Sequence, residues 1–171
     1  HGQGATATTF GGMFTVSAFT SFAKLLTLLG AGLTLILINA WCAESGVNRF
    51  ELPLLVLFAT TGMMLMISAN DLIALYVGVE LQSLSLYVLA AIHRDNLRST
   101  EAGVKYFVLG ALASGLLLYG ASMVYGFAGT TTFTGIAAAV ESGGNHLGLL
   151  VGIVFVIAGL SFKVSAVPFH M

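Results

Sequence analysis

The feature that most constrains this chain is a series of long apolar runs separated by short polar or glycine-rich segments. Several runs reach about 18 residues or more and carry no polar stripe at helical spacing, which is the pattern of helices that face lipid. Because 57% of the residues are hydrophobic and only 8% are charged, the composition agrees with this interpretation. The sequence therefore predicts an all-α, polytopic transmembrane helix bundle.

The apolar runs predict about five transmembrane helices in a single membrane domain that covers residues 1–171. They are expected at residues 18–41, 52–68, 72–92, 99–127 and 147–171, with the last one unfinished. The sequence begins at His1 without the features of a signal peptide and stops at Met171 in the middle of a hydrophobic stretch. We interpret it as a fragment of a longer chain.

Positive charges indicate how the spans are oriented. The connection after the first span carries Arg49 and the connection after the third carries Arg94 and Arg98, whereas the other two connections carry neither lysine nor arginine. By the positive-inside rule, the arginine-bearing connections face the cytoplasm or its equivalent. A net charge of -1 provides no basic surface for nucleic acid, and the single Cys42 excludes an intrachain disulfide and a cysteine-held iron-sulfur cluster.

Polar residues at the start of two spans predict where those helices begin. Asn70 or Asp71 can cap the third helix, because a side-chain oxygen there can accept from the free backbone N–H groups. Ser99 together with Glu101 is expected to do the same for the fourth helix.

Charged residues inside the spans are the candidate functional groups. Burying one charge at mid-membrane costs roughly 2.5 to 3.5 kcal/mol, so each needs a reason. Glu80 lies about eight residues into its helix, or ~12 Å from the outer end, which is too deep to reach water. Lys105 lies ~9 Å inside the cytoplasmic start of its helix, where a long side chain can still reach the headgroups. Lys24, near the outer end of its helix, is interpreted as an interfacial anchor.

The last apolar run ends in a predicted helix break. Pro168 has no backbone N–H to donate to the Val164 carbonyl, so the helix is expected to break directly after Lys163. Broken helices at membrane depth line hydrated cavities and mark ion sites in transporters. His170, just past the break, is a candidate proton relay, and a structural hydrogen bond is its alternative role.

A glutamate and a lysine ~7 Å apart, at an effective dielectric constant of ~20, attract each other by about 2.4 kcal/mol. This is similar to the cost of burying one of them. Burial disfavours a charged lysine and a nearby carboxylate favours it, so opening or closing such a pair can move a proton. We interpret Glu80 as the movable counter-charge of a buried lysine. A structural ion pair or a lipid-headgroup contact remains the alternative for Glu80, and snorkelling to the interface for Lys105 and Lys163.

Three stretches carry a family resemblance: "SANDLIALYVGVELQSLSLYVLAA", "STEAGVKYFVLGALASGLLLYG" and "GLSFKVSAVPFHM". Together they resemble the proton-translocating, antiporter-like subunit N of respiratory complex I, the NADH:quinone oxidoreductase. The resemblance extends from about Phe14 to Met171, and the "ELQSLSLY" form is closer to subunit N than to its sister subunits M or L. It implies part of an antiporter-like inverted-repeat fold with a discontinuous last helix.

The resemblance also implies roles for individual residues. Glu80 matches the central glutamate of the family, Lys105 the lysine of the following helix, and Lys163 the lysine of the broken helix that pairs with the glutamate across a half-channel. The chain itself is then expected to hold no cofactor and to perform no redox chemistry. NADH, FMN, iron-sulfur clusters and quinone belong in other subunits, and subunits M, K and J are the expected neighbours in a bacterial inner membrane or an equivalent organelle membrane.

Two other functions remain open from the sequence. A subunit of a monovalent cation/proton antiporter would share the resemblance, and sodium dependence would distinguish it. A structural membrane subunit with no conducting role would tolerate neutralisation of Glu80 and Lys163.

Overall fold

The computed structural model describes residues 7–45, 49–142 and 147–167. An antiparallel hairpin comes first, with β1 (Ala7–Thr9) and β2 (Phe14–Val16) joined by one 3-10 turn, η1 (Phe10–Gly12). The rest is helical, which confirms the predicted all-α bundle. The helices are α1 (Ala18–Ser45), α2 (Glu51–Ser68), α3 (Leu72–Ala90), α4 (Leu97–Ala128), α5 (Phe133–Glu141) and α6 (Leu147–Lys163).

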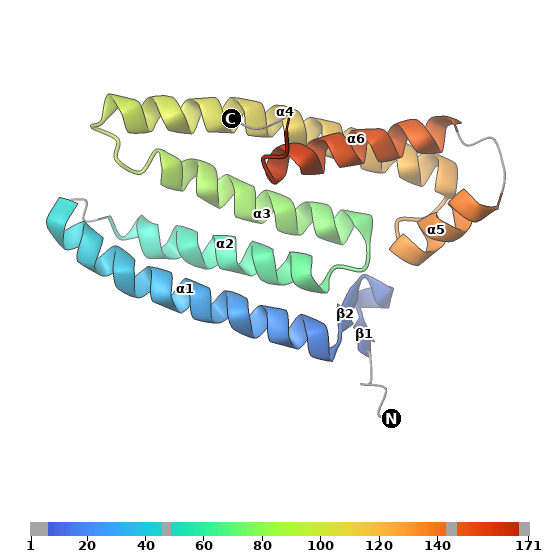
Figure 1. The fold of residues 1–171 in the computed structure, drawn as a ribbon, viewed down its shortest axis with the longest axis horizontal. Coiled ribbons are helices and arrows are strands. Elements are labelled where there is room, and N and C mark those ends of the chain that lie inside the picture. The colour runs from blue at the N-terminus through green and yellow to red at the C-terminus, as the bar shows by residue number, and fades with distance from the viewer. Residues whose placement is uncertain (1–6, 46–48, 143–146, 168–171) are drawn as a thin grey trace.

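The long helices pack as neighbours in chain order, and α6 then packs beside α4 (Figure 1). Four of them, α1 to α4, are long and apolar enough to cross a membrane, and α6 is a shorter apolar helix. The α1 segment has none of its membrane-spanning window buried within the chain, and most of its leucine and phenylalanine side chains are exposed. This is the surface expected of a helix that contacts lipid or another protein.

One helix was not expected from the sequence. The glycine- and threonine-rich connection after α4 contains α5, which begins where the Thr132 hydroxyl accepts a hydrogen bond from the Gly135 N–H at 3.3 Å. A run of three alanines, residues 137–139, follows this cap. Because alanine has the highest helix propensity, the cap and the run together are sufficient to start a short helix.

Of the two predicted caps, that of α3 is confirmed and that of α4 is wrong. Asp71 Oδ1 accepts from the Ile73 N–H at 2.8 Å and from the Ala74 N–H at 3.3 Å. At α4 the cap is Asn96, three residues earlier than predicted, and it accepts from the Ser99 N–H at 3.4 Å. Ser99 therefore lies in the first turn, and its hydroxyl instead donates to the Ala90 carbonyl at 2.8 Å.

The backbones of α4 and α6 are in direct contact. A Cβ atom added to Gly120 would lie 2.7 Å from the Gly152 carbonyl oxygen, and one added to Gly159 would lie 2.9 Å from the Ala113 carbonyl oxygen. Only residues without a side chain allow such an approach. The end of α6 is therefore held against the middle of α4.

α6 ends at Lys163, where the sequence predicts a break, but the described residues give this end a different cause. The Ser165 N–H donates to the Phe162 carbonyl at 3.1 Å, and the Ala166 N–H donates to the Ser161 carbonyl at 2.9 Å. With Ser165 at a φ of 53°, this is the Schellman pattern that ends a helix by a left-handed residue. Pro168 and His170 lie outside the described residues.

Candidate functional site

The candidate site is a polar cluster between α3, α4 and α6. On α3, Glu80, Ser83 and Tyr87 are spaced by three and four residues, so they share one face of the helix. Ser114 on α4 and Lys163 at the end of α6 complete the cluster. The close α4–α6 packing holds the Lys163 backbone near α4, and its long side chain reaches across to α3.

Lys163 and Glu80 form an ion pair inside this cluster. Lys163 Nζ lies 3.3 Å from Glu80 Oε1, and the two side chains are 13% and 19% exposed. Because water screens such a pair far less than one on a surface, each charge depends strongly on the other. The structure thus brings together two of the residues that the sequence singled out.

Three hydroxyl groups surround the lysine ammonium. Lys163 Nζ donates to Ser83 Oγ at 2.9 Å, to Tyr87 Oη at 3.0 Å and to Ser114 Oγ at 3.1 Å. An ammonium has three protons to donate, so these hydroxyls and the carboxylate share them. The ammonium is 5.5 Å from the Tyr87 ring centroid, which means that its contact is with the hydroxyl oxygen.

Ser114 links the two charges. Its hydroxyl accepts from Lys163 and donates to Glu80 Oε1 in a short hydrogen bond. A hydroxyl can rotate to accept or donate as its neighbours require. The cluster can therefore keep hydrogen-bond partners for both residues if a proton moves between them.

Lys105 is not part of this cluster. Its ammonium forms an ion pair with Glu101, one helical turn earlier on α4, and both side chains are more than half exposed. Lys105 therefore lies on an outer face of the described chain, apart from the Glu80–Lys163 pair.

Comparison with known proteins places the chain among membrane subunits of respiratory enzymes. Residues 69–171, which include α3 to α6, match the family described as NADH:quinone oxidoreductase/Mrp antiporter, TM. The chain belongs to this antiporter family. Antiporter-family membership agrees with the apolar helices and makes the chain a multi-pass membrane protein.

One curated relative in the antiporter family is NADH-quinone oxidoreductase subunit N of Rhodospirillum rubrum. It is 70% identical over 95% of this chain, and the chain spans 34% of its length. Among solved structures, respiratory complex I from Thermus thermophilus with bound aureothin matches with a TM-score of 0.75 and 35% identity, over 93% of this chain and 34% of the other.

A second structural match comes from an archaeal respiratory membrane complex, the membrane-bound sulfane sulfur reductase. It has a TM-score of 0.63 and 30% identity, over 68% of this chain and 24% of the other. The antiporter fold thus occurs in membrane complexes named for different redox reactions. The fold by itself does not identify the reaction to which a member is coupled.

The described residues contain no group of three or more histidine, cysteine or acidic side chains that could hold a metal ion. Cys42 is a free thiol on α1, away from the polar cluster. Of the residues that sequence reasoning singled out, Pro168 and His170 lie outside the described part of the chain. Their expected roles in this antiporter-family member remain predictions.

Sequence reasoning did not single out Tyr87 and Ser114 as members of the site. The signal for Tyr87 is its position seven residues after Glu80, which returns it to the same helix face. Nothing comparable identifies Ser114, because its role depends on how α4 packs against α3 and α6. Ser83, one turn after Glu80, also accepts a hydrogen bond from Lys163.

Proposed function

We propose that this chain is part of subunit N of an NADH:quinone oxidoreductase and that it moves protons through a membrane half-channel. The 70% identity with the Rhodospirillum rubrum subunit supports this assignment more directly than family membership does. NADH oxidation and quinone reduction then occur in other subunits, together with FMN and the iron-sulfur clusters. Subunits M, K and J are the proposed membrane neighbours.

The observation that carries the proposal is the enclosed Glu80–Lys163 pair. Burying charges within a membrane protein is costly, so charged residues there usually have a function. Both side chains of this pair are less than one-fifth exposed. While the pair is closed, the Glu80 carboxylate balances the charge of the Lys163 ammonium. When it opens, the same lysine loses this stabilisation and can release its proton. Coupling then requires that the redox reaction drives this opening and closing.

Lys105, His170 and Pro168 have weaker support as parts of the same path. In the described chain Lys105 pairs with Glu101, so its proposed role requires that it changes partner during turnover. His170 is proposed as a relay beyond the helix end, and Pro168 as the residue that prevents the helix from continuing.

A monovalent cation/proton antiporter subunit is the second candidate, because the matched family description includes both classes. An antiporter would exchange protons for sodium without NADH. Sealed vesicles that contain the intact protein distinguish the two: a sodium gradient that drives proton movement without NADH would favour the antiporter.

The proposal is tested by Glu80→Ala in the intact complex. Proton pumping, measured with a pH-sensitive dye in sealed vesicles, is expected to fall at least tenfold, and the NADH:quinone rate should fall with it. Glu80→Asp should retain part of the activity, because its carboxylate keeps the charge on a shorter arm. Glu141→Gln, which changes an exposed carboxylate on α5, is the matched control.

Normal pumping by an assembled Glu80→Ala complex would refute the proposal. That result would instead favour a structural, non-conducting role for the ion pair.

A further inference from the structure

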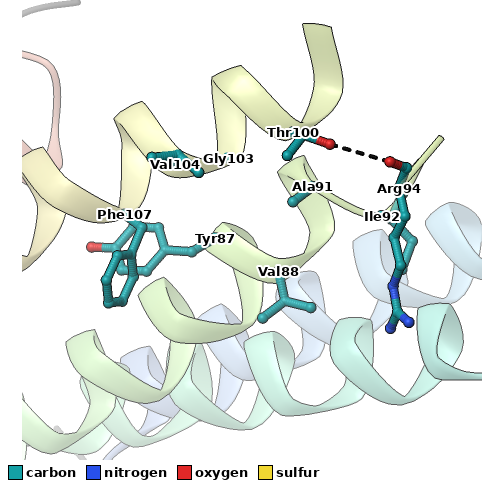
Figure 2. Close-up of a pocket in the computed structure, with 9 residues that line it drawn as sticks. All are labelled: Tyr87, Val88, Ala91, Ile92, Arg94, Thr100, Gly103, Val104 and Phe107. Atoms are coloured by element: carbon teal, nitrogen blue, oxygen red, sulfur yellow. Dashed lines mark hydrogen bonds between the residues drawn. The ribbon is translucent and has the colours of Figure 1, made fainter. Parts of the chain in front are cut away.

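A pocket lies between the end of α3 and the start of α4, on the side that the positive-inside rule assigns to the cytoplasm (Figure 2). Its volume is about 420 Å³, and its walls are mainly apolar. At the connection between the two helices, the Thr100 hydroxyl donates to the Arg94 carbonyl at 3.3 Å. The pocket therefore begins at a polar connection and extends along the two helices toward Tyr87 and Phe107.

Tyr87 stands at the inner end of this pocket. Its side chain is only 5% exposed, and its ring packs edge-on against Tyr106 and Phe107 at centroid distances of 4.7 and 5.9 Å. Figure 2 shows its hydroxyl pointing away from the Arg94 end of the pocket. That hydroxyl accepts the hydrogen bond from Lys163. The same residue thus contacts the pocket with its ring and the ion pair with its oxygen.

Gly110 on α4 makes room for this arrangement. A Cβ atom at residue 110 would lie 2.0 Å from the Tyr87 hydroxyl oxygen, so no other residue could occupy this place without displacing the tyrosine. The ring is consequently fixed between two aromatic side chains, with its hydroxyl in a recess of α4.

We propose that Tyr87 is the positioning residue that controls access to Lys163 from this pocket. Its hydroxyl holds the ammonium beside Glu80, and its ring separates the ammonium from the pocket. The walls of the pocket beside the ring are mainly apolar, so they disfavour water next to the ammonium while the ring is in place, which limits proton leakage. Lys163 exchanges its proton with this side of the membrane only when the ring moves into the pocket. This inference rests on the proposed function of the Glu80–Lys163 pair.

The two parts of the tyrosine are tested separately in the intact complex. Tyr87→Phe keeps the ring and removes the hydroxyl, so pumping should fall several-fold while passive proton permeability stays at the wild-type value. Tyr87→Leu removes the ring, so the imposed pH gradient should also decay several-fold faster without NADH. Tyr106→Phe is the control, because Tyr106 packs on Tyr87 but accepts no hydrogen bond from Lys163 among the described contacts.

The measurements are protons pumped per NADH oxidised and the decay of a pH gradient in sealed vesicles, each normalised to the amount of assembled complex. A purely structural role would lower the amount of complex and leave both normalised values unchanged. If Glu80→Ala abolishes pumping but both Tyr87 variants match the wild type, this inference is wrong and the proposed function stands. If Glu80→Ala itself pumps normally, the proposed function fails first.

Discussion

Two carboxylates, one at the start of α3 and one in its middle, are held in opposite ways. Glu80 lies in mid-helix, and its partners are side chains from two other helices, the Lys163 ammonium of α6 and the Ser114 hydroxyl of α4. Ser83 and Tyr87 of α3 complete the shell around the lysine. Asp71 lies at the helix start, is 2% exposed, and accepts from two backbone N–H groups and from the Thr131 hydroxyl. It has no ion pair among the described residues.

The two carboxylates differ in whether their hydrogen-bond partners can move. Backbone N–H groups at a helix N-terminus are fixed in place, so the two that Asp71 accepts from stay beside it as long as α3 is folded. Side-chain partners can rotate away, so the ion pair of Glu80 lasts only while Lys163 stays beside it. One carboxylate therefore serves the fold, and the other can serve proton transfer.

The surroundings of Asp71 support a structural role. The Leu72 N–H donates to the Thr131 carbonyl at 2.9 Å, and the Asn70 N–H donates to the Met13 carbonyl at 2.8 Å. The start of α3 is thereby attached both to the segment before α5 and to the N-terminal hairpin. The hairpin, the start of α3 and the segment before α5 meet at the end of the bundle opposite the arginine-bearing connections (Figure 1).

The largest expected effect is that of Asp71→Ala on stability. The loss should be about 2 to 4 kcal/mol, because a removed N-cap costs up to about 2 kcal/mol and a lost hydrogen bond to a charged group about 1.5 to 3 kcal/mol. The yield of assembled complex and the midpoint of its thermal unfolding should both fall.

Asp71→Asn tests whether the negative charge of Asp71 is needed in addition to its role as a cap. Asparagine caps a helix as well as aspartate does, so assembly and pumping should both recover. Glu80→Gln, by contrast, should assemble and fail to pump. An Asp71→Asn complex that assembles normally but does not pump would show that Asp71 also carries protons.

Gly110→Ala should have an intermediate effect on activity. The added methyl group would displace the Tyr87 hydroxyl from Lys163, so pumping per assembled complex should fall several-fold. Gly115→Ala on the same helix is the matched control, because a Cβ there meets nothing within 4 Å. Equal pumping by the two alanine variants would show that the position of Tyr87 does not matter.

The smallest expected effect is that of Lys105→Gln. Since its ion pair with Glu101 is exposed, the unfolding midpoint should not change measurably. The family resemblance predicts that pumping falls, but by less than in Glu80→Ala. Wild-type pumping in sealed vesicles would remove Lys105 from the proposed path.

The sequence was sufficient for features that depend on local composition. Apolar runs predicted the four long helices α1 to α4, and a charge within such a run singled out Glu80 without any knowledge of its partner. The Asp71 cap was also predictable, because a cap is formed by residues close in sequence. The Asn96 cap was missed because Ser99 and Glu101 offered a competing signal of the same kind only three residues later.

Features that depend on packing were not predictable from the sequence. Ser114 joins the site because α4 turns this residue toward both α3 and α6, and apolar runs do not specify which face of a helix does so. The sequence placed the end of α6 at the correct residue, but it did so from Pro168, which lies outside the described residues. The observed stop of α6 comes from a left-handed serine, a conformation that serine adopts less readily than glycine or asparagine.

The glycine contacts between α4 and α6 have a mechanical consequence. Two helices whose backbones approach this closely lose many contacts if they separate, so we expect α4 and α6 to move as one unit. The Lys163 Cα atom then has a fixed position relative to Ser114. A movement that separates the ammonium from Glu80 must then come from rotation about the side-chain bonds of Lys163 or from displacement of α3 relative to α4 and α6.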